Sequence, residues 1–159
     1  MQGRIEIVAE KKFVGKRYVM SFSANTTYEL WKEFMPARTR IRNCVGTALY
    51  SIENYPPKFF DSFDPHADFE NWAAVEVADF SSIPDGMETF IIPAGKYAVF
   101  VHRGAASRGQ ETYEKIFMSW LPNSGFVVDA RPHFAVMGEN YKHEDPESEE
   151  EIWIPVRPK

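Results

Sequence analysis

Hydrophobic and polar residues follow two different periods along the chain, and these periods predict secondary structure over most of its length. In residues 87–103, the runs METFIIP and YAVFVHR are rich in β-branched and aromatic side chains and stand on either side of the turn signal AGK. They predict two strands joined as a hairpin. Ser107 and Gln110 have the spacing of a capping box. One apolar helix face follows, and Pro122 ends it: Tyr113, Ile116, Phe117, Trp120 and Leu121. HFAVMGENY and EIWIPV then read as strands.

The first 80 residues show the same order of strands and one helix. RIEIVA and FVGKRYVMSF predict strands, a helix is expected from about Thr27 to Met35, and TALYSIENY and NWAAVEVADF predict two more strands. The triplet Glu-Asn-Tyr occurs at 53–55 and again at 139–141, and Trp72 matches Trp153. We therefore predict a single domain made of two repeats, at about 1–80 and 87–159.

The repeats are expected to share one core, because neither can bury both a sheet face and a helix face alone. The predicted fold class is α+β. It consists of duplicated β-β-α-β-β units with pseudo-twofold symmetry, in which antiparallel sheet and two main helices surround a central groove.

Composition and charge exclude several classes of function. The net charge is −5, whereas nucleic-acid binders usually carry a basic face, so we expect no direct nucleic-acid binding. A single cysteine excludes an internal disulfide, and the longest apolar run, YAVFV, is too short to cross a bilayer. We expect a cytoplasmic protein without membrane contact. The four histidines lack the spacing of metal ligands, and no phosphate-cradling loop is found, so we expect neither metal nor cofactor.

Five stretches in this order resemble the GyrI-like effector-binding domain of AraC-type and multidrug-sensing transcription activators, which also occurs as a stand-alone bacterial protein. They are ELWKEFMP, WAAVEV, PDGMETFIIPAGKYAVFVHRG, YEKIFMSWLPNSGF and EEEIWIPV. The resemblance implies two units side by side, with a central groove that accepts flat, lipophilic, often cationic molecules. It also implies a stand-alone member, since no helix-turn-helix precedes the first repeat.

The same resemblance implies a Glu directly after Phe134 and a Tyr two residues further on, both lining the groove. This sequence has Ala135 and Met137 at those positions, and alternation puts both on one strand face. The expected wall is therefore apolar. The departure argues against the family's usual cation site and against the hydrolase chemistry of some relatives, so we predict no catalytic residue.

Glu76 is the acid that we single out as a counter-charge for a cationic ligand. Alternation in WAAVEVADF puts it on the same strand face as Trp72, so that a ring and a carboxylate would line the groove together. The alternative is a carboxylate that faces solvent. Tyr50 and Trp120 are further candidate walls, although core packing is the commoner role for Trp120. The predicted ligand-binding residues are Glu76, Trp72, Tyr50, Trp120, Ala135 and Met137.

Three functions remain open from the sequence. The first is a small-molecule-binding protein that senses or sequesters aromatic, cationic compounds. The second is a hydrolase of strained electrophilic molecules, for which Glu76 and Tyr50 would have to supply the acid–base pair. The third is a gyrase-inhibitor-type interaction with a basic protein partner through the acidic loop at residues 144–151.

Overall fold

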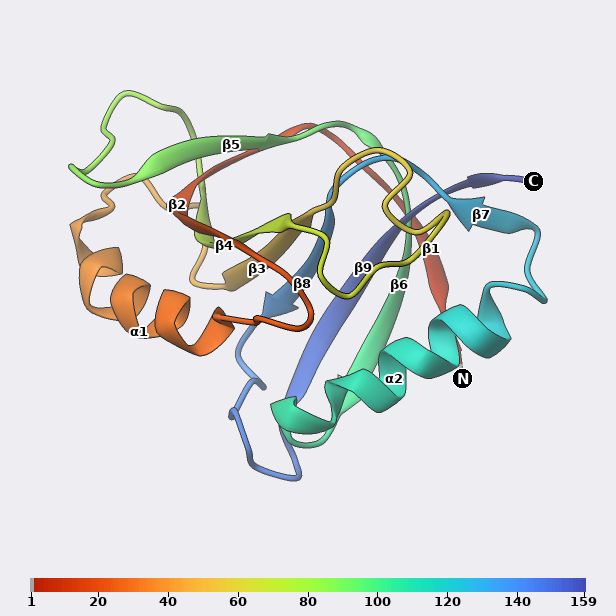
Figure 1. Ribbon diagram of the computed structural model, residues 1–159. Coiled ribbons are helices and arrows are strands. Elements are labelled where there is room, and N and C mark those ends of the chain that lie inside the picture. The colour runs from red at the N-terminus through yellow and green to blue at the C-terminus, as the bar shows by residue number, and fades with distance from the viewer. Residues whose placement is uncertain (1) are drawn as a thin grey trace.

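The computed structural model describes residues 2–159, and its elements follow the predicted order (Figure 1). Short 3-10 turns occupy Arg38–Arg40 and Ala106–Arg108, and α2 continues into a π-helical stretch at Ile116–Trp120. The strands and helices are β1 (Arg4–Val8), β2 (Lys11–Met20), α1 (Thr27–Ala37), β3 (Leu49–Asn54), β4 (Phe69–Val77), β5 (Glu88–Ile92), β6 (Gly95–Arg103), α2 (Gly109–Lys115), β7 (Phe126–Val128), β8 (His133–Met137) and β9 (Glu149–Pro158).

The strands form one antiparallel sheet with a symmetric order. The order is β1-β6-β9-β8-β3-β4-β2-β5, and β7 pairs with β9. Exchanging each strand of the first half for its counterpart in the second gives the same order from the other end. Strands β3 and β8 meet in the middle, where Ile52 lies opposite Phe134. The predicted α+β fold, an antiparallel sheet with two main helices, is confirmed, and the symmetric order supports the predicted duplication.

The predicted hairpin is wrong in its pairing, although both of its strands are present. β5 pairs with β2 of the first half, and β6 pairs with β1. Gly95 belongs to β6 rather than to a turn, and a Cβ there would collide with the guanidinium group of Arg131. Glycine at this position therefore permits a close approach of the Arg131 side chain. Pro93 follows β5 and has no N–H to donate to a ladder.

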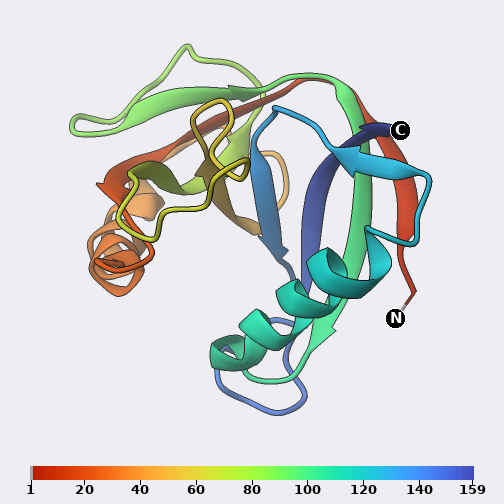
Figure 2. The same ribbon diagram turned by 45° about the vertical axis from the view of Figure 1, so that its right-hand side comes forward.

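Both helices lie on one face of the sheet, on either side of its middle (Figure 2). Leu30 and Phe34 of α1 are fully buried against side chains of β2 and β4. Ile116 is fully buried against β6 and β9, and the rest of the predicted apolar helix face packs around it. The opposite sheet face carries a third apolar cluster, formed by Phe13, Ile52, Trp72, Ala74, Ile92, Tyr97, Val99 and Phe134.

The start of α2 differs from the predicted capping box. No side chain caps the helix, and Ser107 instead bonds to the loop between β8 and β9. The Ser107 hydroxyl donates to Glu144 Oε2 at 2.7 Å, and the Ser107 backbone N–H donates to Oε1 at 3.1 Å. The carboxylate of Glu144 thus fixes this loop against the turn that precedes α2.

Candidate ligand-binding site

The middle of the sheet brings together polar side chains from both halves. Glu53 of β3 pairs with His133 of β8, so the two side chains are neighbours on the face that carries the helices. The ring centroid of Tyr55 lies 5.0 Å from that of His133. Glu150 of β9 lies on the same face of the sheet, and Tyr113 of α2 packs against that face; these two residues complete the group. We call these five residues the central polar cluster.

Glu53 has the most perturbed acidic group of the cluster. Removal from water raises its pKa from 4.5 to about 8; the Ser51 hydroxyl, which donates to Oε1 at 3.1 Å, offsets part of the rise, and the negative charge of Glu150 adds to it. Within residues 2–159, Glu53 has no ion-pair partner. At neutral pH the Glu53 carboxyl therefore holds a proton.

The other side chains of the cluster are short of partners as well. Burial lowers the pKa of His133 to about 3, and burial raises the pKa values of Tyr55 and Tyr113 well above 10. In the described part of the chain, neither the His133 ring nor the two phenol groups make a hydrogen bond. Because these atoms have no partner within the described residues, they are available to a ligand.

An aromatic segment, residues 55–69, covers the cluster on its way from β3 to β4. Figures 1 and 2 show this segment, in yellow, between the two helices. The ring centroid of Phe60 lies 4.8 Å from Tyr55, 5.9 Å from His133 and 6.2 Å from Phe117 of the second half. Phe60 is 43% exposed. The aromatic segment therefore covers the cluster with rings, and a flat apolar molecule can displace such a ring and stack in its position.

Three of the predicted ligand-binding residues lie on the other face of the sheet. Tyr50, Trp72 and Glu76 alternate onto the face that holds the third apolar cluster. The Glu76 carboxylate is only 16% exposed and lies 3.5 Å from Nζ of Lys11, so its charge already has a partner. These three residues do not line the central polar cluster, and a ligand contact by them stays a prediction.

The remaining predicted residues divide between the cluster and the core. Ala135 lies opposite Ser51 and Met137 opposite Leu49, so both share the sheet face of the cluster. Trp120 packs edge to face against Phe100, with ring centroids 5.0 Å apart, inside the apolar cluster under α2. Its placement favours the core role over ligand contact.

The two halves correspond through their tryptophans rather than through the repeated Glu-Asn-Tyr triplet. Trp72 pairs with Ile52, and Trp153 pairs with Phe134. Each indole Nε1 donates at 3.2 Å to the glutamate two residues earlier in its strand. Ile52 of the first half is therefore the structural equivalent of Phe134 of the second half.

Glu53 then corresponds to Ala135, and not to Glu139, which is exposed after the end of β8. The Glu and Tyr that the resemblance places after Phe134 are therefore present in the first half, as Glu53 and Tyr55. Sequence reasoning missed them because it aligned the identical triplets. The signal that could have found them is the run of an apolar residue, Glu, any residue and Tyr at positions 52–55.

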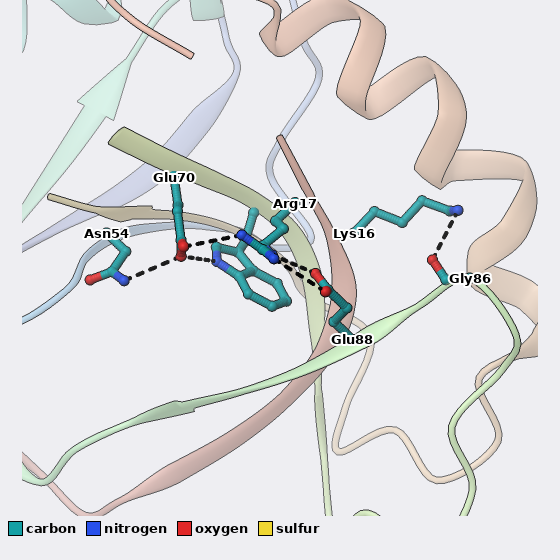
Figure 3. A network of polar contacts seen from close by, with 7 residues as sticks. Lys16, Arg17, Asn54, Glu70, Gly86 and Glu88 are labelled. Carbon is teal, nitrogen blue, oxygen red and sulfur yellow. Dashed lines mark hydrogen bonds and ion pairs between the residues drawn. The ribbon is translucent and has the colours of Figure 1, made fainter. Parts of the chain in front are cut away.

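A second polar site lies on the opposite face, beside the edge strand β5. Figure 3 shows Arg17 between two carboxylates; its Nε lies 2.6 Å from Glu88 and its Nη1 3.2 Å from Glu70. The hollow here measures about 540 Å³ and is lined by Arg17, Glu70, Trp72, Ile83, Met87, Glu88 and Thr89. Since its arginine and carboxylates satisfy one another, the hollow offers a charged ligand less than the central polar cluster does.

Three of the six acids in the segment at 144–151 bond to side chains elsewhere in the chain. Besides Glu144, which bonds to Ser107, Glu149 pairs with Arg103 at 2.9 Å and Glu151 with Arg4 at 2.8 Å. These three carboxylates are therefore less available to the basic protein partner of the third function.

Residues 2–159 contain no group of three or more His, Cys, Asp or Glu side chains placed to hold a metal ion. Nor is any helix in the described range long and apolar enough to span a bilayer.

Solved structures share this fold. SAV2435, described as bound to tetraphenylphosphonium, matches with a TM-score of 0.75 and 17% identity over 99% of this chain and 94% of that chain. The C-terminal domain of EcmrR matches with a TM-score of 0.71 and 19% identity over 99% and 98% of the two chains. A hydrolase from Listeria innocua has a TM-score of 0.61 and 11% identity, over 98% and 92%. At these identities the likeness shows the fold alone.

Sequence comparison is more specific. The transcriptional regulator BrlR of Pseudomonas aeruginosa is 29% identical over 145 residues, which are 90% of this chain and 51% of that protein. The chain thus spans about half the length of the curated relative it matches. The family described as the GyrI-like small molecule binding domain matches residues 1–157. Because that match covers nearly the whole chain, this protein belongs to the GyrI-like small-molecule-binding domain family.

Proposed function

We propose that this protein binds lipophilic cations at the central polar cluster, with Glu53 as the counter-charge. The observation that carries the proposal is the Glu53 carboxyl, which is mostly buried, has no cationic partner in residues 2–159 and lies under a cover of aromatic rings. SAV2435, which shares the fold, was solved with a lipophilic cation. Such binding serves to sense or sequester these compounds, a role suggested by the relationship to the regulator BrlR.

Binding exchanges a proton for the charge of the ligand. An unpaired carboxylate is costly in this environment, so the free protein keeps Glu53 protonated at neutral pH. A cation that enters next to Glu53 favours the carboxylate form, and the surrounding rings add about 1–2 kcal/mol by cation–π contact. Binding therefore releases about one proton per site near neutral pH, and affinity rises with pH up to about 8.

Titration with tetraphenylphosphonium near pH 8, measured by calorimetry, tests the proposal. Wild-type protein should bind saturably, and Glu53→Gln should weaken binding by at least about tenfold, because the counter-charge is lost. Glu76→Gln is the matched control, since Glu76 lies on the other face and pairs with Lys11. Absence of saturable binding would overturn the function. If Glu76→Gln loses binding and Glu53→Gln binds like wild type, Glu76 is restored as the counter-charge of the site.

A hydrolase is the second candidate, favoured by one observation. A carboxyl whose pKa lies near neutrality suits general acid–base catalysis, and Tyr55 and Tyr113 lie close to Glu53. Incubation with a strained-ring electrophile separates the candidates. Turnover that Glu53→Gln abolishes identifies a hydrolase, whereas stoichiometric binding without turnover identifies a binding protein.

A further inference from the structure

We propose that the preferred ligands of this site are dications, with one positive centre held by Glu53 and the other by Glu150. The inference rests on the proposed function, because it concerns the same central polar cluster and specifies the charge of its ligand. It makes Glu150 the residue that distinguishes dications from monocations.

Glu150 differs from the acids on either side of it in β9. Glu149 pairs with Arg103 and Glu151 pairs with Arg4. Glu150 has neither an ion pair nor a hydrogen bond within residues 2–159, although it is mostly buried. Alternation turns Glu150 to the opposite face from its two neighbours, which is the face of the cluster.

The basic side chain opposite Glu150 in the sheet forms no ion pair with it. His102 lies directly opposite in β6, and its Nε2 is 3.0 Å from the carbonyl oxygen of Ala105, which can only accept. Nε2 therefore carries hydrogen, and Nδ1, 2.6 Å from the Thr112 hydroxyl, can accept from it. Both ring nitrogens of His102 therefore have a partner other than Glu150.

His133 supplies an independent indication of a ligand. His133 is 7% exposed as a residue, and its ring lies beside Glu53 and makes no hydrogen bond in the described residues. Such a group normally has a partner. The neutral His133 ring also leaves the two carboxyl groups without a positive charge from the protein.

The two carboxyl groups face one interior from different halves of the chain. β3 and β9 both pair with β8, so Glu53 and Glu150 lie on the same sheet face with one strand between theirs, and Tyr113 of α2 packs on that face. A monocation can pair with one of them and leaves the other unpaired in a site of low polarity. A second positive centre removes that cost, since each carboxylate then has its own counter-charge.

Ethidium and propidium test the inference, because they share one phenanthridinium ring and propidium carries a second, quaternary ammonium charge. Binding to the full chain is measured by fluorescence and calorimetry near pH 9. Wild-type protein should bind propidium at least about tenfold more tightly than ethidium. Glu150→Gln should remove this advantage, so that it binds the two dyes about equally. Glu53→Gln should weaken the binding of both dyes, and the control Glu149→Gln should behave like wild type.

The outcomes separate the inference from the function on which it rests. Equal or weaker binding of propidium to wild type, or an advantage that persists in Glu150→Gln, overturns the inference and leaves the cation site intact. Failure of both dyes and of tetraphenylphosphonium to bind overturns the proposed function itself. The comparison of two dyes on wild-type protein needs no variant, so it decides even if Glu150→Gln does not fold.

Discussion

Replacement of Glu53 by Gln tests whether a mostly buried carboxyl without a cation weakens the fold. The pKa of Glu53 is raised by burial to about 8, against 4.5 for the ordinary group. The folded state therefore holds the proton more tightly than the unfolded state. Its contribution to stability is complete below about pH 4.5, falls as the pH rises to about 8, and is constant above. Gln keeps the shape of the acid and has no proton to lose.

The magnitude follows from the same values. A rise in the pKa from 4.5 to about 8 corresponds, at 1.36 kcal/mol for each pH unit, to a loss of about 5 kcal/mol at pH 9. About 3 kcal/mol of this is already lost at pH 7. Glu53→Gln should therefore be more stable than wild type by up to about these amounts, and nearly equal to it at pH 4.

Urea unfolding followed by tryptophan fluorescence at pH 4, 7 and 9 gives the difference in unfolding free energy. Glu76→Gln is the control, since Glu76 pairs with Lys11 and should show no gain that grows with pH. The reasoning is refuted if Glu53→Gln is no more stable than wild type at pH 9, or if its gain is the same at all three pH values.

Three further results are expected. The affinity of wild type for tetraphenylphosphonium should fall about tenfold for each pH unit below 8, whereas the affinity of Glu53→Gln should not change with pH. Calorimetry in buffers of different ionisation enthalpy measures the protons released on binding; if wild type releases none near neutral pH, binding is not coupled to Glu53. Phe60→Ala should bind the same cation several-fold faster in stopped-flow measurements, because the Phe60 ring, which contacts Phe117 and His133, no longer has to move aside. An unchanged association rate would contradict entry of the ligand through the aromatic segment at 55–69. Gly15→Ala should lose about 3 kcal/mol or more of stability in urea, because its Cβ would meet the carbonyl oxygen of Ala73, whereas Gly125→Ala, with open space, should lose less than about 1 kcal/mol.

The sequence was sufficient for the elements but not for their pairing. Alternation and helical spacing located both helices and every strand except β7, because burial on one face is a local pattern. Pairing is not local: the AGK run looks like a hairpin turn, yet Gly95 serves the Arg131 side chain, which is distant in sequence. Only the sheet shows that β5 and β6 each pair with strands of the other half.

The acid of the site could not be chosen from sequence for a similar reason. Glu53 and Glu76 both alternate with apolar residues in strands. What separates them is a neighbour: Lys11 lies 3.5 Å from Glu76, whereas no lysine or arginine of residues 2–159 pairs with Glu53. The register of β3 on β8 puts Glu53 beside His133 in the middle of the sheet, and a strand pattern alone does not specify its register partner.

The exchange of first strands between the halves has a consequence for how such a binding site can diversify. A lone copy of the unit could build the same sheet as a homodimer whose protomers swap their leading strand, but its centre would then carry every acid twice. In one continuous polypeptide the two halves vary independently. Glu53 of the first half is equivalent to Ala135 of the second, and Glu150 is supplied by the second half only. Substitutions in each half can therefore adapt the site to one end of an asymmetric ligand. The strand pairing between the halves holds them together.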